Sequence, residues 1–382
     1  MSHDYNQEAL ALHKTHHGKI ELHTKVPMEN RDDLSRAYSP GVAEVCKEIA
    51  KDVNNAREYT LKRNTVAIVS DGSAILGLGN LGAHAAIPVM EGKAAILKSF
   101  ADVDAFPICL DTQDIEEIIK AVKQIAPVFG AVNLEDIAAP KCFEIEERLR
   151  RELPIPVMHD DQWGTATVVL GGLINALKVT SREGREDIKI VVNGVGSAGV
   201  AVSRLLLASG YTNILFCDTK GIIFEGRGDE MNKEKKELVS KSIAQGFSGT
   251  LADAVKEADV FIGVSKAGAL TKEMAESMNE DAIVFALANP VPEIMPDVAK
   301  EAGVAVIATG RSDYPNQLNN SLIFPGLFKG MLDNNIKQFE TEMFVRAAHA
   351  LASHVKDLSP ENILPTMFDK ELVDVIASSV TQ

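Results

Sequence analysis

The stretch IKIVVNGVGSAGVAVSRLLLASG, residues 188–210, decides the fold class of the second half of the chain. Its first residues form an apolar run typical of a buried strand, and its last residues have the apolar spacing of a helix. Between them, Gly194, Gly196 and Gly199 have the spacing G-x-G-x-x-G, with Ser197 and Ala198 in the same turn. In such a unit the glycines provide a tight turn, close approach of the backbone to a pyrophosphate, and close packing of helix on strand. The stretch therefore predicts a dinucleotide-binding unit, although a glycine triplet by itself can also be a structural turn.

The next predicted strand supplies an acidic residue at the expected place. The run ILFCD ends at Asp218, roughly 20 residues beyond the glycines, where a carboxylate meets the ribose hydroxyls of the coenzyme. The start of the intervening helix offers backbone N–H groups to the phosphates. Asp218 should repel the additional phosphate of NADP, whereas Lys220 could pair with it. Because a like-charge clash in a pocket outweighs an exposed lysine pair, we expect NAD to be preferred, with NADP as the alternative.

A second glycine triplet has the same spacing in a different context. Gly77, Gly79 and Gly82 in GLGNLG also fit G-x-G-x-x-G. Pro88 follows shortly afterwards, and an internal proline removes a backbone hydrogen bond and interrupts a helix. We therefore expect GLGNLG to be a turn that lines the substrate cleft and not a second dinucleotide site.

Both halves of the chain alternate strand-like and helix-like segments. The first half predicts strands at residues 65–72, 74–82 and 105–112, and helices at residues 114–126 and 143–153. The second half predicts parallel strands, apolar on both faces, at residues 188–194, 214–218, 259–264, 283–290 and 304–310. We expect an α/β fold in which an N-terminal domain, residues 1–162, precedes a Rossmann-like doubly wound domain with a C-terminal helical extension, residues 163–382.

Length and composition restrict the class of protein. The 382 residues suffice for two domains at about 100 to 200 residues each. No apolar run reaches the roughly 18 residues of a membrane helix, and MSHDYNQEAL lacks the pattern of a signal peptide, so we expect no membrane contact and a cytoplasmic location. A net charge of −15 argues against nucleic acid as a partner, and the four cysteines have no spacing that indicates disulfides or zinc. An anionic substrate must therefore be held by locally placed cations.

Two acidic pairs lie in apolar surroundings, where a charge is costly. They are Glu135 with Asp136 in VNLEDIAAP, and Asp160 with Asp161 in PVMHDDQWGT. Unpaired buried carboxylates cost several kcal/mol, and a hard divalent metal such as Mg²⁺ or Mn²⁺ would satisfy them with oxygen ligands. Helix caps or surface turns are the alternative for either pair alone. Lys93 in PVMEGKAAIL is unremarkable by itself.

Seven motifs resemble one enzyme family in their order along the chain: SDGSAILGLGNLG, IPVMEGKA, NLEDIA, HDDQWGT, NGVGSAG, LANP and QLNNSLIFPG. Together they resemble the malic enzymes in their short bacterial form, from about Tyr38 onward. The resemblance implies oxidative decarboxylation of (S)-malate to pyruvate and CO₂ with NAD(P) and Mg²⁺ or Mn²⁺, and decarboxylation of oxaloacetate. It also implies a homodimer or a higher homo-oligomer.

The resemblance assigns the metal and substrate to particular residues of the two halves. It implies that Glu135, Asp136 and Asp161 bind the metal in an N-terminal substrate and metal domain. It implies that Asn289, close to the dinucleotide site, and Asn319 reach the substrate and the nicotinamide.

The resemblance also divides proton transfer between two side chains. Lys93 would contact the substrate as the general base, with Asp160 steadying it, and Tyr38 in AYSPGVAEV would be the general acid. Without the resemblance, Tyr38 would be assigned to a turn. Lowering a lysine pKa from about 10.4 to about 7 requires roughly 4 to 5 kcal/mol of destabilisation of the ammonium form. Since burial and a nearby divalent cation both act in that direction, we expect a lowered pKa for Lys93.

Two positions depart from the family pattern, and two other functions compete. Long, eukaryotic-type malic enzymes have an arginine that clamps a malate carboxylate where this chain has Ala74, and Arg311 is one candidate to replace it. Trp163 stands where related short enzymes commonly have histidine, and we expect it not to contact the substrate.

Two other functions are alternatives to a malic enzyme. A malolactic enzyme would keep NAD bound and produce lactate. A nucleotide-binding regulatory protein would require vestigial metal carboxylates.

Overall fold

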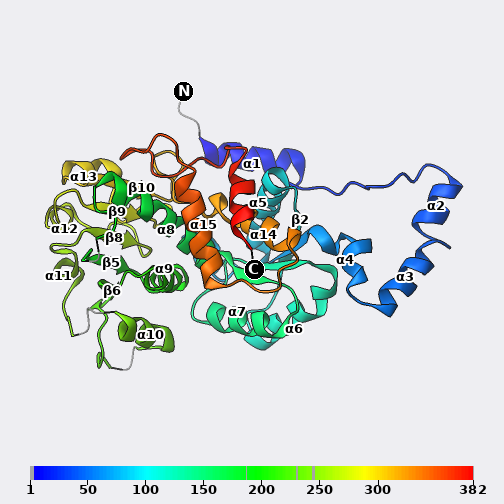
Figure 1. Ribbon diagram of the computed structural model, residues 1–382, viewed down its shortest axis with the longest axis horizontal. Helices are drawn as coiled ribbons and strands as arrows, with labels where there is room; N and C mark the ends of the chain where they lie inside the picture. The colour runs from blue at the N-terminus through cyan, green and yellow to red at the C-terminus, as the bar shows by residue number, and fades with distance from the viewer. Residues whose placement is uncertain (1–3, 186, 229–230, 243–245, 382) are drawn as a thin grey trace.

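The computed structural model describes residues 4–185, 187–228, 231–242 and 246–381. Within these residues the chain forms two separate β-sheets with helices on their faces (Figure 1). The α/β class and the Rossmann-like second half expected from the sequence are confirmed. Across the described part of the chain, no helix combines the length and the apolar character needed to cross a membrane.

The first sheet has four parallel strands in the order β2-β1-β3-β4. Its strands are β1 (Thr65–Ser70), β2 (Asp104–Cys109), β3 (Ala131–Leu134) and β4 (Val157–His159). The connecting helices are α5 (Ala83–Ala101), α6 (Ile115–Ile125) and α7 (Lys141–Glu152). Because parallel strands require such crossovers, the carboxyl ends of all four strands lie at one edge of the sheet.

Residues 74–101 differ from the sequence-based expectation in two ways. Segment 74–82 is not a strand but a 3-10 turn (Ile75–Gly77) followed by a loop, since its glycines have positive φ values. Pro88 lies inside α5 without ending it, so the expectation that it interrupts a helix is wrong. The helix continues because one face, including Met90 and Leu97, is fully buried, and this burial outweighs the roughly 3 kcal/mol cost of an internal proline.

The second sheet has the order β10-β9-β8-β5-β6-β7, and only β7 is antiparallel to its neighbour. Its strands are β5 (Ile190–Asn193), β6 (Ile214–Asp218), β7 (Gly221–Ile222), β8 (Val260–Gly263), β9 (Ile283–Ala286) and β10 (Val306–Thr309). The helices between them are α9 (Ser197–Ala208), α10 (Lys233–Lys241), α11 (Leu251–Val255), α12 (Lys272–Glu276) and α13 (Pro296–Glu301). The central strands are buried on both faces, which explains their uninterrupted apolar runs.

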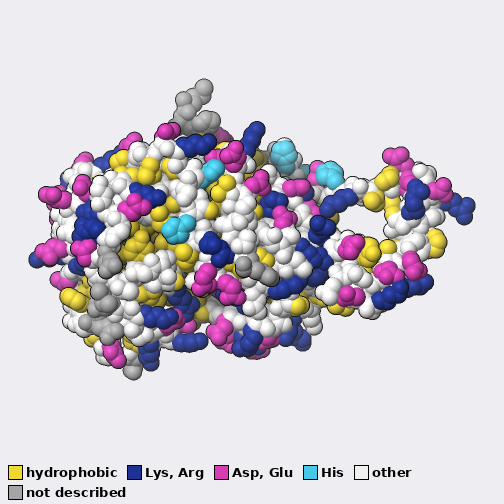
Figure 2. Space-filling view, viewed as in Figure 1, with side chains coloured by type: hydrophobic (Ala, Val, Ile, Leu, Met, Phe, Trp, Pro, Cys, Tyr) yellow, Lys and Arg dark blue, Asp and Glu magenta, His cyan; other side chains and the backbone are white. Residues whose placement is uncertain are grey.

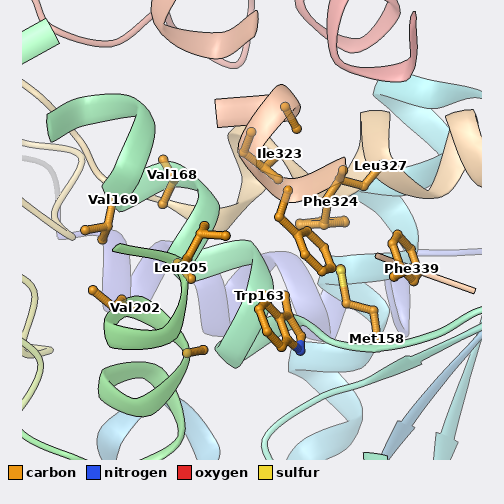
Figure 3. Packing of buried hydrophobic residues seen from close by; sticks show 14 of the residues in the cluster. Met158, Trp163, Val168, Val169, Val202, Leu205, Ile323, Phe324, Leu327 and Phe339 are labelled. Carbon is orange, nitrogen blue, oxygen red and sulfur yellow. The ribbon is translucent and has the colours of Figure 1, made fainter. Parts of the chain in front are cut away.

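One hydrophobic core joins the two sheets. Helix α8 (Asp160–Val179) starts directly after β4 and packs against α9, so the boundary expected at residues 162/163 falls within its first turn. The remaining helices are α14 (Phe324–Asp333), α15 (Thr341–Ser353) and α16 (Leu372–Ser379). They lie between the halves, with α15 against α8 and α14 against α5 (Figure 1). In Figure 3, Met158, Trp163, Phe324 and Phe339 meet in this core.

The N-terminal helices are α1 (Tyr5–His16), α2 (Arg31–Ala37), α3 (Val42–Lys51) and α4 (Asn55–Tyr59). We call α2 and α3 the arm, because they extend away from the body of the molecule (Figure 1). Helix α3 has no fully buried residue, and apolar side chains near it are exposed, including Leu34 and Val53. Figure 2 shows hydrophobic side chains among the charged ones on the arm. Exposed apolar surface on an extended segment is typical of contact with another chain.

Candidate active site

Three carboxylates meet at the carboxyl edge of the first sheet. Glu135 and Asp136 directly follow β3, and Asp161 lies in the first turn of α8, directly after β4. Because β3 and β4 are parallel neighbours, one oxygen of each residue lies within 4.8 Å of the others. The backbone N–H of Asp136 also donates to Asp161 Oδ2 at 2.8 Å. The fold thus brings together the three residues that the sequence analysis assigned to a metal.

The charge of this cluster is unbalanced. Glu135, Asp136 and Asp160 are buried. Lys93 forms ion pairs with Glu135 and Asp160, and the charge of Asp161 also acts on it. With Asp136, these four carboxylates against one ammonium group leave three excess negative charges when ionised. Burial and the charge of Asp161 raise the pKa of Asp136 to about 7, and burial raises the pKa of Glu135 and of Asp160. Among the described residues, Asp136 Oδ2 and Asp160 Oδ1 have no hydrogen-bond partner. A hard divalent cation with oxygen ligands fits this donor set.

Lys93 lies beside the carboxylates on α5. Its Nζ forms a hydrogen-bonded ion pair with Asp160 and lies 3.0 Å from Glu135 Oε1. The ammonium group also lies 4.3 Å from the ring centroid of Phe324. Burial lowers the pKa of Lys93, but the charges of Asp160, Glu135 and Asp161 raise it, and the net pKa lies above its usual value. The expectation of a lowered pKa includes a bound divalent cation and stays a prediction. The sequence did not show how closely Asp160 and Glu135 approach the ammonium group.

Asn319 precedes a turn of the second half of the chain that packs against α8, the helix that carries Asp160 and Asp161. It caps the 3-10 turn η4 (Asn320–Leu322), and its Oδ1 accepts a hydrogen bond from Ser321 N at 2.9 Å. A Cβ at Gly164 would lie 3.1 Å from the Cβ of Asn320 and would overlap Asp160 Oδ1. Glycine at this position therefore permits the start of η4 to pack closely against the first turn of α8.

The GLGNLG turn lies between the carboxylate cluster and Asn289. The backbone N–H of Leu76 donates to Asp136 Oδ1 at 3.4 Å, and a Cβ at Gly77 would lie 2.8 Å from the backbone oxygen of Asn289. Leu76 has a φ of +45°, a strained value for a bulky side chain of the kind that clusters at functional sites. Asn289 is exposed in the loop after β9. The turn thus connects the two loops that the sequence analysis assigned to metal and substrate.

Tyr38 does not join the cluster within this chain. It follows the last residue of α2, its side chain is 66% exposed, and the arm lies far from α5 in Figure 1. Lys93, in contrast, is buried within α5. The two residues expected to share proton transfer therefore lie in separate parts of one chain.

The glycine motif opens onto a cavity at the carboxyl edge of the second sheet. Gly194 has a φ of +110°, and a Cβ at Gly199 would overlap the Gly194 carbonyl, so both positions require glycine. Helix α9 begins at Ser197 with Gly196 as its N-cap, and the first N–H groups of a helix have no intrahelical partners. The cavity of about 660 Å³ is lined in part by Gly194, Gly196, Asp218, Lys220 and Lys235. This arrangement suits a pyrophosphate at the start of α9.

Asp218 lies in this cavity, but it is paired with two cations that the sequence analysis did not identify. Arg227 Nη1 donates to Oδ1 at 2.9 Å, Arg227 Nη2 donates to Oδ2, and Lys235 Nζ donates to Oδ2 at 2.7 Å. Burial raises the pKa of Asp218, but these donors outweigh it and hold the pKa well below its usual range. The sequence-based argument for NAD considered Lys220 as the cation that could offset the charge of Asp218. Arg227 and Lys235 also offset that charge. No sequence pattern pointed to Arg227 or Lys235, because the fold of the segment after β7 brings them to the strand end.

Arg311, the candidate carboxylate clamp, is engaged within its own loop. Its Nε and Nη2 pair with the two carboxylate oxygens of Asp313 at 2.8 and 2.6 Å. Its Nη1 donates to the backbone oxygen of Pro290 at 3.2 Å. Arg311 thus connects its loop to the LANP segment after β9.

Another cation lies beside the segment in which Ala74 replaces the arginine of the longer enzymes. Lys141, which the sequence analysis did not single out, forms an ion pair with the buried Asp71. In the same segment, the backbone N–H of Ala74 donates to the backbone oxygen of Asp136 at 2.9 Å. The segment is thereby fixed against the carboxylate cluster.

Two family models match separate parts of the chain. Residues 17–150 match the malic enzyme N-terminal domain, and residues 163–382 match the malic enzyme NAD binding domain. The second match alone covers more than half of the 382 residues.

Individual relatives agree with these matches. The chain is 53% identical to the bifunctional malic/malolactic enzyme of Bacillus subtilis, over 98% of this chain and 92% of that protein. It is 53% identical to the NAD-dependent malic enzyme of Geobacillus stearothermophilus, over 96% of this chain and 76% of that protein. The crystal structure of the NAD-dependent malic enzyme from Thermotoga maritima superposes with a TM-score of 0.94 at 46% identity, covering 97% of this chain and 98% of that one. Matched in both halves and along nearly its whole length, this chain belongs to the malic enzyme family.

Proposed function

We propose that this malic enzyme uses a divalent metal and NAD to oxidise and decarboxylate (S)-malate to pyruvate and CO₂, and that it also decarboxylates oxaloacetate. The observation that carries the proposal is the cluster of the buried Glu135 and Asp136 with the half-buried Asp161, beside Lys93. In this proposal, residues 1–162 supply the substrate and metal groups, and residues 163–382 supply the coenzyme site and the C-terminal helices.

An absorbance assay tests the reaction directly. Malate and Mn²⁺ are supplied with NAD or with NADP, reduced coenzyme is followed at its absorbance maximum, and pyruvate is quantified at the end. We expect equal amounts of reduced coenzyme and pyruvate, and no turnover in EDTA. Full activity in EDTA, or reduced coenzyme without pyruvate, would contradict the proposal.

Lys93 is the proposed base for the C2 hydroxyl of malate, because it is buried within contact of the carboxylate cluster. Its contact with Asp160 fixes the position of Nζ, and in the neutral amine the lone pair of this nitrogen would accept the C2 hydroxyl proton. A bound Mg²⁺ or Mn²⁺ would polarise the C2 oxygen of the substrate and compensate the carboxylate charges that raise the pKa of Lys93. Burial of Lys93 against the Phe324 ring also limits the access of water to the base.

Two residues near the cluster are proposed to hold the substrate and the nicotinamide. Two observations support this role: η4, which follows Asn319, packs closely at Gly164, and the backbone oxygen of Asn289 lies close to Gly77 of the GLGNLG turn. Both contribute amide donors and acceptors from the coenzyme half of the chain. These contacts would place the C2 carbon of malate beside the nicotinamide, as hydride transfer requires.

Tyr38 is proposed to act in the site of a second copy of the chain. The supporting observations are its 66% exposure, its position at the end of α2 in the extended arm, and the exposed apolar residues nearby. Such a homo-oligomer would bring a phenolic proton donor to a cluster that otherwise contains one ammonium and four carboxylates. The proposal therefore predicts that a monomer lacks the acid for enolpyruvate.

Mixing two inactive variants tests this shared site. Tyr38→Phe and Lys93→Ala each impair every site in their own oligomers, but a mixed dimer contains one site with both residues intact. We expect activity to return when the two proteins are unfolded and refolded together, and not when they are mixed after separate refolding. A fully active monomer in light scattering under assay conditions would contradict the proposal.

A malolactic activity is the second candidate, favoured by the name of the Bacillus subtilis relative. In that reaction the coenzyme stays bound and returns the hydride to pyruvate, so lactate accumulates without free reduced coenzyme. The absorbance assay, extended by measuring lactate, separates the two activities. Lactate formed from malate in the presence of catalytic NAD would support the second candidate.

A further inference from the structure

A buried carboxylate outside the metal cluster holds the first turn of α8. Glu146, on α7, is only 5% exposed. Its Oε1 accepts the backbone N–H of His159 at 2.9 Å. Its Oε2 accepts Gln162 Nε2 at 3.0 Å and the indole N–H of Trp163 at 3.2 Å. The three donors come from immediately before and immediately after the two aspartates of the HDDQWGT motif.

This arrangement explains why an acid is buried there. A carboxylate has only acceptor positions, and each of the three contacts provides a donor, so both oxygens are satisfied. Burial raises the pKa of Glu146, while the charge of His159 and the hydrogen bonds act in the opposite direction. Substituting an apolar residue would leave the His159 N–H and the Gln162 amide without this acceptor inside the protein, and an unpaired buried donor is destabilising. The position of the turn is therefore strongly coupled to the Glu146 carboxylate.

Trp163 connects this carboxylate to the aromatic core. Its indole is stacked on Phe344 with a centroid distance of 4.8 Å and an interplanar angle of 8°, and Phe344 is stacked in turn on Phe339. Trp163 and Phe339 lie among the buried residues of the shared core in Figure 3. The indole therefore has one edge fixed by Glu146 and one face fixed by the C-terminal part of the chain. These two contacts explain why a tryptophan is present at position 163 without requiring it to contact the substrate.

We propose that Glu146, through its contacts with His159, Gln162 and Trp163, is a positioning residue that sets the geometry of Asp161 toward the metal and of Asp160 toward Lys93. The inference rests on the proposed metal site. Asp161 is fixed on its other side by the backbone N–H of Asp136, so a shift of the α8 turn changes the separation between Asp161 and the proposed ligands that follow β3. Partners that orient metal ligands typically contribute 10- to 100-fold in metal affinity.

Mn²⁺ binding to the full-length protein, measured by titration calorimetry and by electron paramagnetic resonance, tests the proposal. Glu146→Met keeps the length of the side chain and removes both acceptors, and we expect it to weaken Mn²⁺ binding by about 10- to 100-fold. Glu146→Gln retains one carbonyl acceptor for the His159 N–H, so we expect an intermediate loss of about threefold. The NAD dissociation constant, which reports on the other sheet, should change by less than about twofold in both variants. Glu144→Met, an exposed change on the same helix, is the matched control.

Each outcome decides between the structural alternatives. A graded loss of Mn²⁺ affinity from wild type through glutamine to methionine, with NAD binding retained, supports the positioning role. Unchanged Mn²⁺ affinity in folded Glu146→Met overturns it, even if the melting temperature falls, because a purely structural role predicts that result. If Glu146→Met does not fold, Glu146→Gln decides, and wild-type Mn²⁺ affinity in that variant overturns the proposal. Absence of Mn²⁺ binding to the wild-type protein would instead contradict the proposed function.

Discussion

The carboxyl edges of the two sheets both carry acidic residues, but their charges are balanced in opposite ways. At the first edge, Lys93 forms ion pairs with Glu135 and Asp160. The carboxylates of Asp136 and Asp161 lie beside that of Glu135. At the second edge, Asp218 alone is paired with both Arg227 and Lys235. The first edge therefore needs additional positive charge, whereas the second has more positive than negative charge.

This difference shows that the position of an acid in a motif does not by itself predict its ligand. The charged groups within contact distance also decide what an acidic residue binds, because they set its pKa and the net charge of its surroundings. At the first edge the pKa values of Glu135, Asp136 and Asp160 are raised. At the second edge the pKa of Asp218 is lowered. The same side-chain chemistry is thus suited to a metal cation at one edge and to hydrogen bonding with a ribose at the other.

The largest expected effect comes from removing one charge from the first edge. Asp136→Asn should lower malate turnover by more than about a thousandfold, since Lewis-acid stabilisation is worth several kcal/mol. Asparagine tolerates the positive φ of +54° at this position, so the fold should persist. Steady-state kinetics measure the loss, and fluorescence titration should show nearly unchanged NAD binding. Asp111→Asn, an exposed change near the end of β2, is the control, and wild-type turnover in Asp136→Asn would refute the assignment.

The next effect separates the two steps of proton transfer. Lys93→Ala should slow hydride transfer by about 10² to 10⁴-fold, the usual contribution of a general base. Tyr38→Phe should impair protonation of enolpyruvate and leave the reduction of oxaloacetate much less affected. Stopped-flow measurement of reduced coenzyme and separate assays of oxaloacetate reduction distinguish the steps, with the exposed Lys98→Ala as control. If Tyr38→Phe loses oxaloacetate reduction as severely as pyruvate formation, the division of roles is wrong.

A smaller effect is expected when the second edge is made to resemble a phosphate site. Asp218→Ser removes the carboxylate that pairs with Arg227 and Lys235, and these cations would then face the coenzyme. We expect the ratio of kcat/KM for NADP to that for NAD to rise by about 10- to 100-fold, because the added phosphate gains two ion pairs. Steady-state kinetics with both coenzymes provide the measurement, and Asp297→Ser, exposed in the same half, provides the control. An unchanged ratio would show that the two cations do not reach the ribose phosphate.

The smallest effect concerns the coenzyme preference of the wild-type protein. We expect kcat/KM to be higher with NAD than with NADP by roughly tenfold at most, corresponding to about 1.4 kcal/mol. The limit follows from Arg227 and Lys235, which compensate the repulsion that the Asp218 carboxylate would otherwise exert on the additional phosphate. Equal or better use of NADP would show that the cations already dominate this edge.

The sequence predicted most of the strands and the glycine-rich turn before α9. Apolar runs identified β1, β5, β8, β9 and β10 because strands buried on both faces need uninterrupted apolar residues. The glycine motif identified the start of α9 because the backbone there is too close to itself for a side chain. Segment 74–82 and Pro88 were wrongly interpreted, since local propensity does not include the burial that stabilises α5 or the conformations that glycine permits.

By itself, then, the sequence determined the fold class, the dinucleotide turn and, through its resemblance to the malic enzymes, the residues expected at the metal site. Only the tertiary structure decided the electrostatic state of those residues. Lys93 pairs with Asp160, 67 positions away along the chain, and with Glu135. Arg227 and Lys235 pair with Asp218, and no pattern in the sequence indicates these pairs. Tyr38 likewise lies away from Lys93 because the arm extends from the body. Charge interactions depend on distances in space and on local burial, and a linear pattern contains neither.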